Sequence, residues 1–139
     1  MDAKKSAVLK EVERKMNGVP IMKLLSAEIT RLDEGTCELR VPRKKNYEGI
    51  FDTFHGGLIT TAADTVAAAA VLTVAGAEAV ITTTDIHIRF LRPCRSDITA
   101  AATVIKAGRT LCPVDVSLTD TDGRQVAVAQ VTYMVIRGK

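Results

Sequence analysis

One apolar run, from about Gly56 to Ala75, constrains the fold of this chain more than any other segment. It is rich in Ala, Val, Leu and Thr, and Asp64 lies near its middle. Gly76 follows it, and glycine commonly ends a helix, so we predict one long helix. The run is long enough to cross a bilayer, but a central Asp costs about 2.5–3.5 kcal/mol on insertion. We therefore predict a buried core helix and no membrane span.

The segments after this helix alternate polar and apolar residues with a period of two, which is typical of strands. Four strands are predicted there, over Thr82–Phe90, Ile98–Ile105, Leu111–Thr119 and Gln125–Ile136. In the first of them Ile86 lies on the apolar face, and Thr83 and Arg89 lie on the polar face. Asp122-Gly123 predicts a hairpin between the last two strands.

The segment before the long helix predicts a shorter helix and two further strands. The helix covers residues 2–17 and stops at Gly18 and Pro20, and the strands cover Ala27–Asp33 and Cys37–Val41. Residues 42–55 are predicted as a loop. Short turns between consecutive strands favour an antiparallel sheet, and a single apolar helix needs cover on most sides. We predict an α+β fold with a curved sheet wrapped around the helix, as one domain over residues 1–139.

Composition excludes several classes of function. Aromatic residues make up 4% of the 139 residues and there is no Trp, which argues against base stacking on nucleic acid. The net charge is +3, and basic residues are interleaved with acidic ones rather than gathered in one stripe. The three Cys residues include no C-x-x-C pair, so we expect no disulfide framework and no metal site. Without an apolar leader at the N-terminus, we expect a cytoplasmic protein.

His55-Gly56-Gly57 stands where the long helix begins. The first N–H groups of a helix are unpaired and carry partial positive charge, and glycines let a ligand approach them closely. Such amides could polarise a carbonyl and hold the oxyanion of acyl transfer. A tight turn that merely enters a helix explains the same three residues.

Asp64 has no Lys or Arg within four residues, although its neighbours are apolar. It is either a structural carboxylate bonded to a Thr hydroxyl or backbone, or a functional acid. Gly57 and Asp64 are seven residues apart, about 10.5 Å along one helix. If both act on one carbonyl, a second subunit must supply one of them, which predicts a homodimer with antiparallel helices and two equivalent sites.

The run from His55 to Asp64 resembles the His-Gly-Gly…Asp signature of hotdog-fold thioesterases, in their phenylacetate-pathway (PaaI-like) branch. Three later segments look similar as well: Asp85-Ile86-His87-Ile88-Arg89-Phe90-Leu91-Arg92-Pro93, Lys106-Ala107-Gly108-Arg109-Thr110, and Thr119 to Ala127. The resemblance covers about residues 25–136. It implies a hotdog fold, an acyl-CoA substrate, no separate cofactor, and a homodimer or dimer of dimers.

The resemblance also implies roles for single residues. The Gly57 amide polarises the thioester carbonyl, and Asp64 of the partner subunit activates water or attacks directly. Thr83 holds the water and His55 helps to position the thioester. In the substrate-binding set, Gly56 adjoins the thioester, Gly108, Arg109 and Thr110 lie along the pantetheine arm, and Arg89 is either a surface charge or a phosphate ligand.

The sequence departs from the family at one position. Many relatives carry Asn or Gln six residues before the His, where this chain has Gly49, and Asn46 stands nine residues before it. Asn46 is therefore the candidate for contact with the carbonyl.

Two other functions fit the resemblance. One is an acyl-CoA hydratase or dehydratase, although Asp52 and His55 are spaced too closely for its Asp and His pair. The other is a non-catalytic acyl-CoA-binding protein, although Asp64 favours catalysis. Ala62, Ala63 and Ala67 are expected to leave room beside the site, which points to medium-chain or aryl acyl groups.

Overall fold

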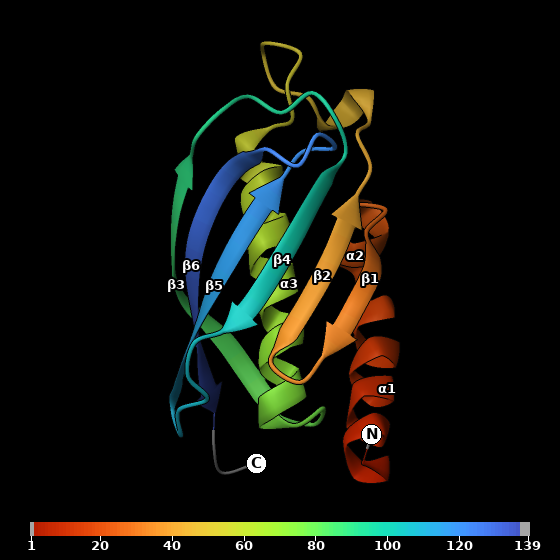
Figure 1. The fold of residues 1–139 in the computed structure, drawn as a ribbon, viewed down its shortest axis with the longest axis vertical. Coiled ribbons are helices and arrows are strands. Elements are labelled where there is room, and N and C mark those ends of the chain that lie inside the picture. Colours follow the sequence, from red (N-terminus) through yellow and green to blue (C-terminus); the bar gives the residue numbers. More distant parts are fainter. Residues whose placement is uncertain (1, 137–139) are drawn as a thin grey trace.

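The computed structural model describes residues 2–136 and contains the predicted N-terminal helix, long helix and six strands (Figure 1). The elements are α1 Ala3–Asn17, α2 Pro20–Leu24, β1 Glu28–Asp33, β2 Thr36–Val41, the 3-10 turn η1 Lys45–Tyr47, α3 Gly56–Ala75, β3 Val80–Phe90, β4 Ile98–Val104, β5 Leu111–Thr119 and β6 Gln125–Ile136. The predicted bounds of the strands differ from these by at most two residues.

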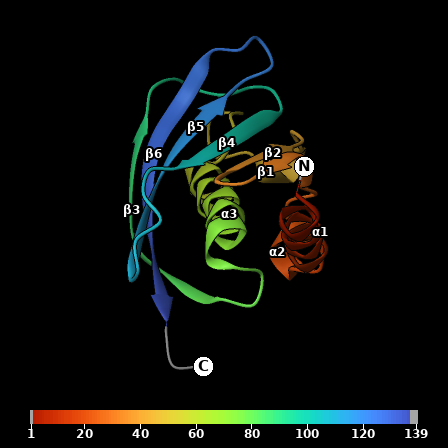
Figure 2. The same ribbon diagram turned by 60° about the horizontal axis from the view of Figure 1, so that its bottom comes forward.

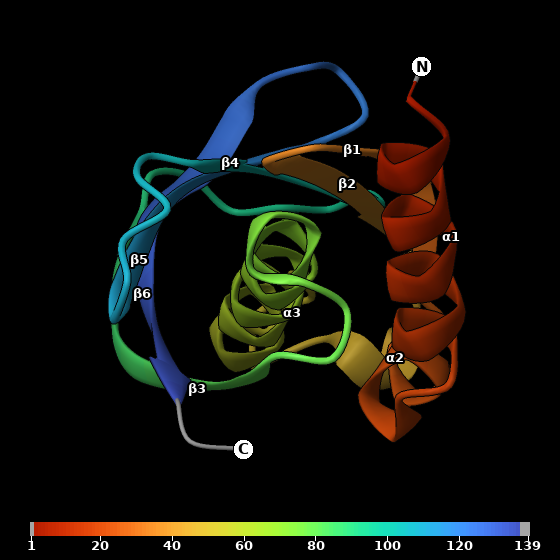
Figure 3. The same cartoon turned by 90° about the horizontal axis from the view of Figure 1, so that it is seen from below.

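The six strands form one sheet in the order β1-β2-β4-β5-β6-β3, and all neighbouring strands are antiparallel. Seen from below, the sheet bends around α3, with β1, β2 and β4 on one side of the helix and β5, β6 and β3 on the next (Figure 3). The fold is therefore the α+β hotdog arrangement that the sequence predicted.

Helix α3 lies in the core. Its inward side chains are small, and Ala62, Ala63, Val66 and Ala67 are almost fully buried. By length and composition α3 passes as a membrane span, but 61% of its apolar window is buried inside the protein. The fold thus accounts for its apolar character as that of a core helix.

Helices α1 and α2 cover α3 on the side away from β3 and β6 (Figure 2). Leu9, Val12 and Met16 recur at helical spacing and form the buried face of α1. The sequence prediction missed α2, because it assigned Pro20 only to the end of the preceding helix. Proline fits the first position of a helix, where its missing N–H would have no partner, and Pro20 begins α2 in this way.

A β-bulge in β3 changes which residues face the helix. Thr83 pairs with Tyr133 of β6, but Asp85 pairs with Thr132, so one extra residue lies between them. An extra residue reverses the alternation of side chains along a strand. Thr83 therefore lies on the inner face together with Ile86, both half-buried. The prediction that Thr83 shares the polar face with Arg89 was wrong.

Candidate functional site

The loop before α3 is anchored to the rest of the fold and fixes the start of the helix. The Phe54 N–H donates to the carbonyl oxygen of Cys94 at 2.9 Å, and the His55 N–H donates to that of Tyr47 at 2.8 Å. The Arg43 guanidinium adds hydrogen bonds within the loop and to the segment before β4. His55 is thus held at a defined position, although its side chain is exposed.

His55 caps α3 and accepts hydrogen bonds from most of the amides at the N-terminus of the helix. Its Nδ1 accepts a hydrogen bond from the Gly57 N–H at 2.9 Å, and its carbonyl oxygen accepts from Leu58 and Ile59 at 3.0 and 3.1 Å. Since Nδ1 is the acceptor, the ring proton belongs on Nε2. Within residues 2–136 no acceptor is bound to the Gly56 N–H. Gly56, rather than Gly57, therefore offers the open amide at the positive end of the helix.

An aromatic ring and a second glycine border this amide. A Cβ atom on Gly56 would lie 3.4 Å from Cζ of Phe90, whose side chain is 49% exposed. A Cβ atom on Gly49 would lie 3.7 Å from Cδ2 of His55, so the position that departs from the family lies beside the site. Asn46 is exposed on η1, and no described residue hydrogen-bonds to its side chain.

Asp64 lies two turns into α3 and is bound by two hydroxyl groups from the sheet. Thr83 of β3 donates to its Oδ1 at 2.9 Å, and Tyr133 of β6 donates to the same oxygen at 2.6 Å. The Tyr133 hydroxyl also lies 3.0 Å from the Asp64 carbonyl oxygen. Asp64 is half-buried, and no Lys or Arg of residues 2–136 forms an ion pair with it.

The two oxygens of the Asp64 carboxylate differ in their surroundings. Oδ1 accepts both hydroxyl bonds, and within the described chain Oδ2 accepts none. In the same part of the chain, no buried side-chain oxygen or nitrogen lacks a hydrogen-bond partner. Oδ2 is therefore open to solvent, and it is the oxygen that can act on a bound molecule.

Tyr133 was absent from the residues predicted for the site. It is 6% exposed, and burial, followed by its hydrogen bond to Asp64, raises the pKa of its phenol above the ordinary value of 10.0. The phenol is thus a proton donor to Asp64 at any physiological pH. One sequence signal pointed to it: a buried Tyr needs a partner for its hydroxyl. The partner could not be inferred, because it lies 69 residues away.

A groove of about 500 Å³ opens between α3 and β3; Thr83 and Tyr133, which bind Asp64, line it, whereas Asp64 itself does not. It is lined mainly by apolar residues together with the two hydroxyl donors: Ala68, Leu72, Ala79, Val80, Ile81, Thr82, Thr83 and Tyr133, with Lys15 at its edge. Ala62, Ala63 and Ala67, which we expected to leave room beside the site, are instead buried in the core. Ala68 is the small helix residue that borders the groove.

The predicted substrate-binding residues are dispersed within one chain. Gly108 and Arg109 lie near Val74, at the opposite end of α3 from Gly56. The Thr110 carbonyl oxygen accepts from the Val135 N–H at 2.7 Å in the same region.

Arg89 lies elsewhere, on the outer face of the sheet in a shallow hollow with Asp85, His87 and Asp115. A single subunit therefore does not bring Arg89 or the Gly108–Thr110 turn to the carboxylate.

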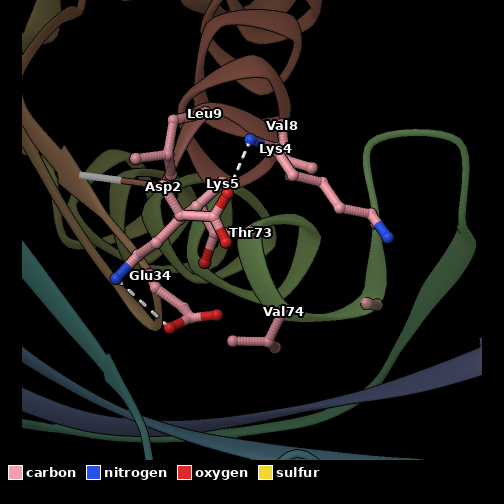
Figure 4. Close-up of a pocket in the computed structure, with 10 residues that line it drawn as sticks. Asp2, Lys4, Lys5, Val8, Leu9, Glu34, Thr73 and Val74 are labelled. Atoms are coloured by element: carbon pink, nitrogen blue, oxygen red, sulfur yellow. Dashed lines mark hydrogen bonds and ion pairs between the residues drawn. The ribbon is translucent and has the colours of Figure 1, made fainter.

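Another hollow, of about 320 Å³, lies between α1 and the C-terminal end of α3 (Figure 4). In it the Lys5 ammonium lies 3.4 Å from Glu34, and the Asp2 carboxylate accepts from the backbone N–H of Lys4. None of the predicted site residues lines it. Within residues 2–136 no group of three or more His, Cys, Asp or Glu side chains could hold a metal ion.

Comparison with protein families matches residues 51–127 to the Thioesterase superfamily. The matched segment contains the open Gly56 amide, Asp64 and Thr83, and it ends before Tyr133. A relative from Saccharolobus solfataricus named "Putative esterase SSO2140" is 29% identical over 86% of this chain and 85% of its own length.

Solved structures show the same fold. A thioesterase family protein from Silicibacter pomeroyi has a TM-score of 0.86 at 27% identity and covers 93% of this chain and 98% of its own. The E. coli PaaI protein from the phenylacetic acid degradation operon has a TM-score of 0.85 over 95% of this chain and 98% of its own. At 21% identity the PaaI likeness concerns the fold.

Proposed function

The chain belongs to the thioesterase superfamily, and from that premise we propose that it is an acyl-CoA thioesterase. It would hydrolyse the thioester of a medium-chain or aryl acyl-CoA to the free acid and CoA. The observation that carries the proposal is the Asp64 carboxylate, with Oδ1 fixed by two hydroxyls and Oδ2 open to solvent.

The proposed chemistry needs a donor for the carbonyl oxygen and a base or nucleophile for its carbon. The Gly56 N–H would polarise the carbonyl and hold the oxyanion that forms on it. Oδ2 of Asp64 would take a proton from water as the water adds to the carbon, or would attack the carbon itself, with water then hydrolysing the mixed anhydride. In both routes the C–S bond breaks as the carbonyl re-forms. The CoA thiolate takes up the proton released by the water, which adds first in the one route and hydrolyses the anhydride in the other.

The donor role moves from Gly57, where the sequence placed it, to Gly56. The Gly57 N–H is already bonded to His55, whereas the Gly56 N–H has no acceptor among the described residues. His55 keeps a positioning role, since its Nε2–H remains a donor at the exposed side of the ring. Thr83 holds the Asp64 carboxylate and still has lone pairs for a water molecule.

The separation of these groups supports a homodimer. Gly56 and Asp64 are eight residues apart on α3, about 12 Å along the axis, which is too far for both to reach one carbonyl. In the described chain β3 pairs only with β6 and leaves an eleven-residue edge unpaired. Exposed edges of this length are readily paired with another strand. Two β3 edges related by a two-fold axis would set the Gly56 amide of one subunit near the partner's Asp64, and two dimers could associate further.

The acyl group would lie in the groove between α3 and β3. Its apolar lining by Ala68, Leu72 and Ile81, and its volume of about 500 Å³, suit a medium-chain or aryl group. The three buried, unpaired cysteines fit a reducing compartment, so we propose a cytoplasmic location.

The test is a panel of acyl-CoA thioesters of different chain length and ring content, followed by detection of released thiol. The protein's own thiols should contribute little, because all three are buried and burial raises the pKa of Cys37 to about 12. Asp64→Asn, which is nearly isosteric, should fold normally and lose about a hundredfold or more in turnover. No hydrolysis of any thioester, or full activity of the Asn variant, would contradict the proposal.

The same panel separates the alternatives. Hydration of crotonyl-CoA without thiol release would indicate a hydratase, and binding without turnover would indicate an acyl-CoA-binding protein. The structure gives no support to an Asp52–His55 pair, since Asp52 is exposed and Nδ1 of His55 is bonded to Gly57.

A further inference from the structure

Tyr133 binds one oxygen of the proposed catalytic carboxylate and is almost fully buried. Its hydroxyl is 2.6 Å from Oδ1 of Asp64, the residue is 6% exposed, and Oδ2, the other carboxylate oxygen, accepts no hydrogen bond within the described chain. Tyr133 also lines the groove proposed for the acyl group, but its hydroxyl is bonded to Oδ1 of Asp64, so we expect it to act through Asp64 rather than on the thioester itself.

We propose that Tyr133 is a positioning residue, which together with Thr83 holds Oδ1 of Asp64 so that Oδ2 alone faces the substrate. The inference rests on the proposed thioesterase function. A carboxylate on a helix can rotate about its side-chain bonds, and a single hydrogen bond would leave much of that freedom. Two donors from neighbouring strands bind one oxygen, at 2.6 and 2.9 Å. They restrict the rotation of the carboxylate and keep its two oxygens from exchanging places.

The β-bulge of β3 brings the two donors to the same oxygen. Thr83 and Tyr133 are directly opposite each other on β3 and β6, and the extra residue before Asp85 turns Thr83 inward. Without the bulge, the alternation that places Ile86 on the inner face would turn the Thr83 hydroxyl outward. The Tyr133 hydroxyl would then be the only donor left for Oδ1.

Within the described residues no charged side chain forms an ion pair with this carboxylate. Lys15 of α1 lines the same groove, but its ammonium donates to the Ala77 carbonyl oxygen at 2.7 Å. Removing either hydroxyl should therefore loosen the Asp64 carboxylate.

The experiment compares Tyr133→Phe, Thr83→Val and Thr83→Ser with the wild type on the best thioester of the panel. Phe and Val remove one hydroxyl each with little change of shape, and Ser keeps the Thr83 donor. We expect each of the first two to lower kcat about tenfold with KM changed less than about threefold, since a bond to a charged group is worth about this much. Thr83→Ser should keep kcat near the wild-type value, because it keeps the hydroxyl that donates to Oδ1.

A double-mutant cycle decides whether Tyr133 acts through Asp64. In the Asp64→Asn background, Tyr133→Phe should cause no further loss, because the carboxylate it holds is gone. A further tenfold loss there would mean that Tyr133 touches the substrate itself and would overturn the proposal. So would a Tyr133→Phe variant with wild-type kcat, or one that changes only thermal stability.

Failure of this inference can be told apart from failure of the proposed function. A wild type that hydrolyses no thioester removes the function and the role of Tyr133 with it. An active wild type, an inactive Asp64→Asn and an unaffected Tyr133→Phe remove only the role of Tyr133. If Tyr133→Phe does not fold, Thr83→Val and Thr83→Ser test the same oxygen from the other strand.

Discussion

The Gly57 N–H of helix α3 donates a hydrogen bond of 2.9 Å to Nδ1 of His55, the residue that caps the helix. This bond gives His55 a structural task besides the substrate contact proposed for it. It also leaves Gly56 as the residue whose amide can face a carbonyl. Variants of His55 and Gly56 can therefore test the stability of the helix and the thioesterase activity separately.

The first prediction concerns the cap. His55→Ala removes the side-chain acceptor, so the free energy of unfolding should fall by about 0.5–1 kcal/mol, whereas His55→Asn keeps a good cap and should cost only a few tenths. Both variants lose the Nε2–H donor, so both should lose activity, by about tenfold in kcat/KM. Denaturant unfolding and thioester kinetics measure the two effects. Wild-type activity in a stable Asn variant would restrict His55 to capping.

The second prediction concerns the open amide. Gly56→Pro removes the N–H and should lower kcat about a hundredfold or more, as loss of an oxyanion donor does. Proline is favoured at the first position of a helix, and His55 before it already has φ −62° and ψ 129°, which a residue before proline adopts readily. The helix should therefore survive.

Gly56→Ala is the matched control. It keeps the N–H, and its Cβ would meet the Phe90 ring at an ordinary contact distance of 3.4 Å, so activity should stay within a few-fold of wild type. If Gly56→Pro is active and Gly57→Pro is not, the donor is Gly57 after all, as the sequence alone predicted.

The third prediction concerns the ionisation of Tyr133. Burial and the Asp64 contact raise the pKa of its phenol above 10.0, so the folded state holds this proton more tightly than the unfolded chain. The contribution to stability is complete below pH 10 and is lost as the pH rises through the folded value. In a Tyr47→Phe background, which leaves one tyrosine, the tyrosinate absorbance reports Tyr133 alone.

Asp64→Asn should lower the pKa of Tyr133 in that background without bringing it to 10.0. The variant removes the charge next to the phenol, but burial, the larger cause, remains. An unchanged titration would show that the contact between the two side chains is not made in solution. This readout does not depend on any enzymatic activity.

The sequence predicted the parts of the fold that local signals determine. The bounds of α3 follow from Gly56 at its start and Gly76 at its end, and Gly76 has the positive φ of 107° that favours glycine there. Asp64 was identified because a carboxylate among apolar neighbours is costly. Each of these inferences needed only a short window of the chain.

The rest of the site depends on strand pairing, which no local pattern contains. The face of Thr83 was predicted wrongly because the alternation of β3 was counted without the bulge, which exists only in the register with β6. Tyr133 was missed because its partner, Asp64, is fixed by that same register. The structural and catalytic explanations of Asp64 were also left open, and its bond to Thr83 fits both, whereas the open Oδ2 favours catalysis.

The last prediction tests whether two subunits share each site. An Asp64→Asn chain and a Gly56→Pro chain each form dimers in which both sites are broken, if each site takes its amide from one subunit and its carboxylate from the other. A mixed dimer gathers both lesions in one site and leaves the second site intact. After subunit exchange at equal amounts, about half of the dimers are mixed and each has one working site. Activity should therefore return to about a quarter of the wild-type value.

Proof of exchange, for example by differently tagged chains, and the normal folding of both variants are the controls. If exchange is complete and activity stays absent, the Gly56 amide and the Asp64 carboxylate act within one chain. The separation of about 12 Å along α3 would then have to be bridged by the substrate rather than by a second subunit.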